Sequence, residues 1–165
     1  MIDRDYARRL AAYNRWMNGK VYTAAAQLTD AQRKEDRGAF FKSIHATLNH
    51  LLCADQIWLR RFTGRPLDGL SLTTPQYEDF AAMRVRRDEV DAELAVWVET
   101  LTAEWLAADF SFHSQAANRR FQQPAWVLVT HLFQHQAHHR GQTTTLLSQF
   151  GLDVGPTDLP AMPEA

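Results

Sequence analysis

The fold is decided by residues 124–151, which read PAWVLVTHLFQHQAHHRGQTTTLLSQFG. Pro124 is typical of a helix start, and Gly151 is typical of the position just after a helix end. At about 1.5 Å per residue such a helix is roughly 40 Å long, enough to form one edge of a bundle. At about 100° per residue, its inward stripe contains Leu128, Leu132, His135, His139, Gln142, Leu146 and Phe150.

Three further helices are predicted by apolar residues that recur at steps of three and four. The first runs from about Ile2 to Leu28. The second runs from about Phe41 to Phe62, and its apolar residues surround most of its circumference. The third begins at Thr74 and Pro75, a favourable pair for a helix start. Its inward residues are Phe80, Met83, Val90, Leu94, Trp97 and Leu101, and its mostly solvated residues are Arg84, Arg86, Arg87, Asp88 and Glu89.

The segments between these helices are predicted to be loops, with one exception. Residues 29–38 are polar and form a connection, and residues 64–74 form another. Residues 109–123 alternate apolar and polar side chains around a turn signal at residues 117–118, which indicates a short β-hairpin. Four long amphipathic helices without a sustained strand pattern predict an all-α four-helix bundle. We expect a single domain over residues 1–165, with a long crossing connection before the last helix.

Composition excludes several classes of protein. The formal net charge is -1 with histidine neutral, so no basic excess attracts a nucleic-acid backbone. No apolar run approaches the roughly 20 residues that span a bilayer, and the first residues lack the layout of a signal peptide. Cys53 is the one cysteine, which excludes an internal disulfide framework. We therefore expect a cytoplasmic protein without nucleic-acid or membrane partners.

Histidines gather on two of the predicted helices. His135 and His139 are four residues apart within the inward stripe, so their imidazoles project side by side from successive turns. His138 lies some 60° from His135 around the helix, and His131 is displaced similarly. The pair therefore points inward, and the other two histidines of this helix lie at the margin of the stripe.

This pair needs a third ligand from another helix, and His50 is the best candidate. Ala46 and Ala54, one turn to either side, leave room beside its imidazole. His45 lies about 140° from His50 around the same helix and cannot easily share its target. Three neutral imidazoles suit zinc, nickel, copper or iron and leave coordination positions open. The alternative is core histidines satisfied by hydrogen bonds, but buried imidazoles without a metal carry a desolvation cost.

Neighbouring residues have both a functional and a packing interpretation. Gln142 could hydrogen-bond an imidazole N–H or a bound water, which is usual beside a metal ligand. For Arg140 we favour packing, with an acid such as Asp55 as its partner. For Cys53 we favour a small buried thiol over a ligand. No catalytic residue can be assigned from these patterns.

Four segments carry a family resemblance. Residues 131–142, HLFQHQAHHRGQ, resemble the hallmark of the DinB-like, damage-inducible superfamily, and the His-x-x-x-His-His-Arg-Gly-Gln pattern within them is fairly specific. Residues 49–58 resemble the second-helix motif of that family, residues 13–18 its first-helix signature and residues 151–159 its closing segment. The resemblance covers nearly the whole chain in the expected order.

The resemblance implies an up-down-down-up bundle, frequent homodimers, and a divalent metal, zinc or nickel first, bound by His50, His135 and His139. Characterised relatives include transferases and isomerases that use a low-molecular-weight thiol, so it implies thiol transfer to a small-molecule substrate, with metal-assisted hydrolysis as the alternative. A non-catalytic, metal-stapled stress-response or interaction module is the second class of function. If the protein is an enzyme, the candidates for its general base are Asp55, Tyr13 and His138.

Overall fold

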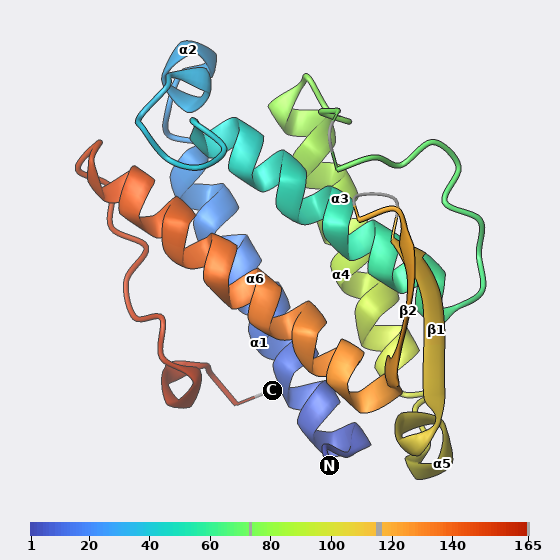
Figure 1. Cartoon of the computed structure of the whole chain (residues 1–165). Helices are drawn as coiled ribbons and strands as arrows, with labels where there is room; N and C mark the ends of the chain where they lie inside the picture. Colours follow the sequence, from blue (N-terminus) through green and yellow to red (C-terminus); the bar gives the residue numbers. More distant parts are fainter. Residues whose placement is uncertain (73, 115–116, 165) are drawn as a thin grey trace.

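The computed structural model describes residues 1–72, 74–114 and 117–164, and most of them form helices (Figure 1). The long helices are α1 (Arg4–Ala25), α3 (Ile44–Phe62), α4 (Phe80–Val98) and α6 (Ala125–Ser148). The shorter elements are α2 (Asp30–Lys34), α5 (Ala103–Ala107), strands β1 (Asp109–Ser114) and β2 (Arg119–Pro124), and the 3-10 turn η1 (Leu159–Ala161). The predicted four-helix bundle is therefore confirmed.

The four long helices form a bundle in which chain neighbours are not always packing neighbours. Helix α1 packs against α4 and α6, and α3 packs against the same two helices. Figure 1 shows that α3 and α4 run in one direction and that α1 and α6 run in the other. This is the up-down-down-up order implied by the resemblance. Two parallel helices in sequence need a connection that returns along the bundle, and residues 63–79 provide it.

Helix starts are set by side chains that accept the first free backbone N–H groups. Such caps are formed by Asp3 at α1, Ser43 at α3 and Asp79 at α4. At the other end of the last helix, Gly151 has a φ of +73°, as expected for the residue that ends it. The ends of α1 and α3 lie within three residues of their predicted positions.

The predicted start of the third helix at Thr74 and Pro75 is wrong, because α4 begins at Phe80. The reason is a set of hydrogen bonds from α3 to the preceding loop. The Asn49 amide oxygen accepts the backbone N–H groups of Gln76 and Tyr77, at 2.9 and 3.0 Å. These N–H groups are thereby fixed outside a helix. Thr73, part of the same start signal, lies outside the described residues.

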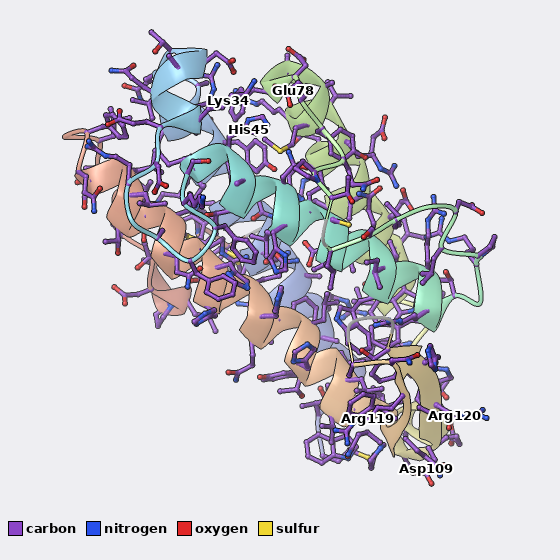
Figure 2. All side chains as sticks on the ribbon, turned by 45° about the horizontal axis from the view of Figure 1, so that its top comes forward. Lys34, His45, Glu78, Asp109, Arg119 and Arg120 are labelled. Atoms are coloured by element: carbon purple, nitrogen blue, oxygen red, sulfur yellow. The ribbon has the colours of Figure 1, made fainter. Side chains whose placement is uncertain are left out.

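An ion pair adds to the anchoring of this loop. Lys34 Nζ lies 2.7 Å from Glu78 Oε1, and Figure 2 shows both residues beside His45 where α2 meets the start of α4. His45 Nε2 lies 2.9 Å from the carbonyl oxygen of Tyr77. His45 therefore contacts the loop before α4 and does not point toward His135 and His139. This agrees with the prediction that His45 and His50 face different directions around the helix.

The predicted hairpin is confirmed. Strands β1 and β2 pair antiparallel, from Asp109 opposite Pro124 to Ser114 opposite Arg119. Figure 1 shows the hairpin against the end of α3 and the start of α6. The Phe112 ring stacks on Phe121 at 5.5 Å and contacts Trp58 of α3 at 5.0 Å between ring centres. The hairpin therefore forms a wall beside the bundle and is anchored there by aromatic contacts.

The core consists of apolar residues from all four long helices. The six residues predicted to face inward from the third helix are all buried. Arg87 was predicted to be mostly solvated, and that prediction is wrong because its side chain pairs with two buried carboxylates. Among the described residues, none of the helices combines the length and apolar character that a membrane span requires.

Candidate metal centre

Three histidines from two helices converge at one point. His50 is on α3, and His135 and His139 are on α6. His135 Nε2 lies 3.4 Å from His50 Nε2 and 3.1 Å from His139 Nε2. Imidazole nitrogens that bind a tetrahedral ion at 2.0–2.1 Å lie about 3.4 Å apart. The two distances from His135 Nε2 fit a single divalent ion, and the ligand atoms of all three histidines lie within 4.8 Å of one another.

The packing of α3 against α6 brings the histidine triad (His50, His135 and His139) together. The i, i+4 spacing places His135 and His139 on adjacent turns of α6, as predicted from the sequence. The structure does not bring His45 or His138 into the triad: the first binds the Tyr77 carbonyl and the second is exposed. In the part of the chain that the structure describes, the group contains no carboxylate.

Burial keeps the triad imidazoles neutral. It lowers the pKa of His50 to about 4, and the nearby His139 contributes in the same direction. It lowers the pKa of His135 to about 3, with smaller contributions from the surrounding histidines, and it lowers the pKa of His139 as well. At neutral pH these rings therefore offer lone pairs rather than positive charge, as a metal ligand must.

A hydrogen bond orients the ring of one triad histidine, whereas the Nδ1 atoms of the other two have no partner among the described residues. His139 Nδ1 lies 2.8 Å from Gln142 Oε1, and an N–H on Nδ1 that donates to this amide leaves Nε2 free to bind a metal. The role predicted for Gln142 thus has the required geometry. The buried Nδ1 atoms of His50 and His135 have no hydrogen-bond partner among the described residues. Such unsatisfied rings do not resemble a hydrogen-bonded set of core histidines.

Phe41 also belongs to this site, although no sequence pattern indicates it. The Phe41 ring stacks on His50, with 4.1 Å between ring centres and 23° between planes, and lies 5.5 Å from His139. Cys53 is buried, and its thiol donates to the Ser71 carbonyl at 3.2 Å. Burial also raises the pKa of this thiol. The prediction of a buried thiol outside the ligand group is therefore confirmed.

A cavity of about 550 Å³ lies beside the triad and is partly lined by His135. Its walls come from α3, α6, the hairpin and the loop after α3, including Trp58, Arg61, Phe112 and Phe121. A smaller cavity of about 120 Å³ lies on the side of His50 and Phe41. Hollows of about 690 and 570 Å³ elsewhere contain no histidine, so size alone does not locate the site.

Arg140, next to the last ligand, points into the bundle and is 4% exposed. Arg140 is therefore part of the buried face, although the inward stripe predicted from the sequence does not include it. Its guanidinium donates to Asn14 and, at 3.0 Å, to Gln136, rather than to Asp55 as predicted. Asp55 instead accepts from Arg87 and Gln136, both at 2.5 Å. Arg140 is connected to Asp55 through the Gln136 amide.

None of the three candidates for a general base contributes an atom to the triad. Asp55 is fully buried and paired with Arg87. The Tyr13 hydroxyl donates to the Thr157 carbonyl at 2.5 Å. The His138 ring lies 4.8 Å from the His139 ring, but its Nε2 faces the Gln142 amide at 3.3 Å. A general base therefore remains unassigned.

Comparisons with known proteins agree with this fold and identify the family. A family model described as the DinB family matches residues 1–165. Protein DinB of Bacillus subtilis (strain 168) is 27% identical, with 93% of this chain and 91% of that protein aligned. The solved structure of YfiT from Bacillus subtilis, described as a probable metal-dependent hydrolase with an unusual four-helix bundle topology, superposes with a TM-score of 0.67. It covers 93% of this chain and 92% of its own at 16% identity, which supports the fold alone.

Proposed function

The chain belongs to the DinB family, and on that premise we propose that it is a metal-dependent enzyme. In this proposal the histidine triad holds one divalent ion, zinc or nickel first, and the ion activates a low-molecular-weight thiol for transfer to an electrophilic small molecule. The observation that carries it is the convergence of three neutral Nε2 atoms beside a cavity of about 550 Å³ that His135 lines.

The chemistry of the donor set supports catalysis more than a purely structural role. A divalent ion held by three imidazoles supplies a Lewis acid with open coordination positions, which lowers the pKa of a water or thiol that occupies one of them. The protein adds a fixed geometry: Gln142 orients the His139 ring, and Phe41 covers the His50 ring on one side. Three uncharged ligands leave the ion's positive charge intact, which favours an anionic nucleophile.

Thiol transfer comes first because none of the three general-base candidates predicted from the sequence, Asp55, Tyr13 and His138, contributes an atom to the triad. A thiol has an ordinary pKa of about 8.5, so a modest lowering yields the thiolate nucleophile without a protein base. Metal-assisted hydrolysis is the second candidate, because the structurally similar YfiT is described as a probable metal-dependent hydrolase. Both reactions use the same ligands and the same cavity.

Metal content tests the proposed ligands directly. The His139→Ala variant should lose the stoichiometric zinc or nickel that the wild-type protein retains, as measured by plasma mass spectrometry after dialysis. His138→Ala is the matched control, since this neighbour is exposed and does not join the triad. Unchanged metal in the His139→Ala variant would refute the assignment.

Turnover separates the two reactions. The metal-loaded protein is assayed with glutathione, bacillithiol or mycothiol and an electrophilic aryl halide, and separately with an activated ester in the absence of thiol. Thiol-dependent loss of the halide supports the transferase, and ester cleavage alone supports the hydrolase. A protein that is inactive in both assays and unfolds when the metal is removed supports the non-catalytic alternative, in which the metal only stabilises the fold.

A further inference from the structure

The cavity beside the triad extends along one face of α3. Ala54 and Arg61 of α3 both line the cavity and are seven residues apart. Seven residues correspond to about two helical turns, or roughly 10 Å along the axis. One end of the cavity therefore lies at the metal ligand His135, and the other end lies near Arg61.

Arg61 lies beside two aromatic rings that also contact each other. Its guanidinium carbon lies 4.8 Å from the ring centre of Trp58 and 4.5 Å from that of Phe112. One of its N–H groups donates to the His113 carbonyl at 3.3 Å. A guanidinium has five N–H donors in one plane, more than this contact with His113 uses, so it has donors to offer to a ligand.

Arg61 also lacks a counter-ion, unlike the arginines next to it. Arg60 pairs with Asp68 at 2.8 Å, and Arg65 pairs with Glu93 at 2.9 Å. Across residues 1–72, 74–114 and 117–164, no carboxylate lies within ion-pair distance of Arg61, and no acidic residue lines the cavity. Burial lowers the pKa of Arg61, which reflects the cost of a partly buried, unpaired cation. An anionic ligand would offset this cost.

We propose that the cavity binds an organic carboxylate with an apolar or aromatic body, that Arg61 binds the carboxylate, and that the reacting end of the molecule reaches the triad. Trp58, Phe112 and Phe121 provide an apolar surface for the body. The identity of the substrate class rests on the proposed function, whereas the binding of the anion by Arg61 does not require the metal.

Arg119 on the hairpin adds positive charge beside the cavity. Figure 2 shows Arg119 on the hairpin, at the end of the bundle opposite Lys34 and Glu78, with Asp109 at the same end. The Arg119 guanidinium lies 4.3 Å from the ring centre of Phe121, which lines the cavity. Positive charge at the rim of a cavity increases the rate at which anions associate with it.

The test is a pair of probes that differ only in charge. The dissociation constants of 6-phenylhexanoate and 6-phenylhexanamide are measured by calorimetry on the full chain, both with zinc bound and after chelation. Wild type should bind the acid at least about tenfold more tightly than the amide in both states, as expected for hydrogen bonds to a charged group. Arg61→Gln should abolish this preference, and Arg61→Lys should retain part of it, because lysine keeps the charge but not the planar fork.

Arg65→Gln is the matched control, since it removes the same charge nearby but outside the cavity and should keep the full preference. Circular dichroism confirms that each variant is folded, and Arg61→Lys remains informative if Arg61→Gln is not. A preference that survives in Arg61→Gln, or that exists only with zinc bound, would overturn the proposal, because the ion rather than Arg61 would then recognise the acid. Failure of wild type to bind either probe would also overturn it. Loss of the preference on chelation does not bear on the metal content of His139→Ala, so the two proposals can fail separately.

Discussion

Two groups of polar side chains lie inside the same bundle, and they differ in how their charges are balanced. The histidine triad contains three neutral bases with no acid among them. The buried charge cluster, which comes from α3, α4 and α6, contains two acids and two arginines, all at most 4% exposed. Its members are Asp55, Arg87, Asp91 and Arg140.

The charges of the cluster balance one another without any ligand. Arg87 lies 2.5 Å from Asp55 and 2.8 Å from Asp91, while Asn18 donates to both oxygens of Asp91. Gln136 links Asp55 to Arg140. The triad, by contrast, directs the lone pairs of neutral rings at one point, and its group contains no carboxylate. The cluster therefore stabilises one arrangement of the helices, whereas the triad is arranged for a cation that the chain does not itself supply.

The largest effect is expected when the charge balance of the cluster is broken. Arg87→Met leaves Asp55 and Asp91 buried without their common cation, which should lower the free energy of unfolding by about 3–5 kcal/mol. Urea unfolding measures the loss, and Arg84→Met on the same helix is the control because its side chain reaches only the Thr23 hydroxyl. A loss below about 1 kcal/mol would show that the cluster does not hold the helices together.

A smaller effect is expected at the triad, where a ligand is added rather than removed. Zinc at a hundredfold excess over its dissociation constant should raise the free energy of unfolding by about 2.7 kcal/mol, because it binds only the folded state. Chelation should remove this gain and leave the bundle helical, and His139→Ala should show no gain. Unfolding on chelation would instead identify the triad as a structural staple.

These two regions also differ in how far the sequence predicts them. The i, i+4 pair on α6 and the position of His50 follow from helical periodicity, so the sequence predicts that these three histidines lie together, and their role as metal ligands stays a prediction. Burial of Arg87 was not predicted, because it depends on Asp55 of another helix, and periodicity within one helix carries no such information. A possible signal was present in Asn18 and Asp55, polar residues at inward positions of otherwise apolar helices.

The same reasoning explains the misplaced face of α6. The sequence centred the inward stripe on the histidines, whereas Gln136 and Thr143, with no exposed surface, lie at the centre of the buried face, and His135 lies at its edge. The predicted stripe was located from apolar residues. The buried face of α6 differs from it because polar residues such as Gln136 and Thr143 are also buried. Similarly, the helix start at Pro75 was a sound local signal that Asn49 of another helix overrides. Contacts between distant segments decided each of these differences.

Orientation of the His139 ring offers a finer test of the triad. Gln142→Ala removes the acceptor of the His139 Nδ1 proton, so the ring can rotate or change tautomer. We expect zinc to bind about 10- to 100-fold more weakly, as is typical when such a partner is lost. Competition with a fluorescent chelator measures the affinity, and Gln134→Ala, an exposed change on the same helix, is the control. A change below about twofold would mean that packing alone orients the ring.

The smallest effect is expected from protons, which compete with the metal for the triad. The folded pKa values of His50 and His135, about 4 and 3, lie below the ordinary value of 6.5, so between these limits the two groups bind more protons in the unfolded chain than in the folded one. Their contribution to the stability of the metal-free protein should therefore be full above pH 6.5 and decrease as the pH falls toward 4. Burial raises the pKa of Asp55 in the charge cluster to about 7, which contributes with the opposite sign in this range, so the histidine contribution is obtained by comparing wild type with a variant. Because both rings are only partly buried, solvent screening limits the loss to about 1–2 kcal/mol per histidine. Urea unfolding at several pH values in the presence of a chelator measures this decrease in the free energy of unfolding. In the His135→Ala variant the decrease should be smaller by the contribution of one histidine. An equal pH dependence in that variant would place the titrating groups outside the triad.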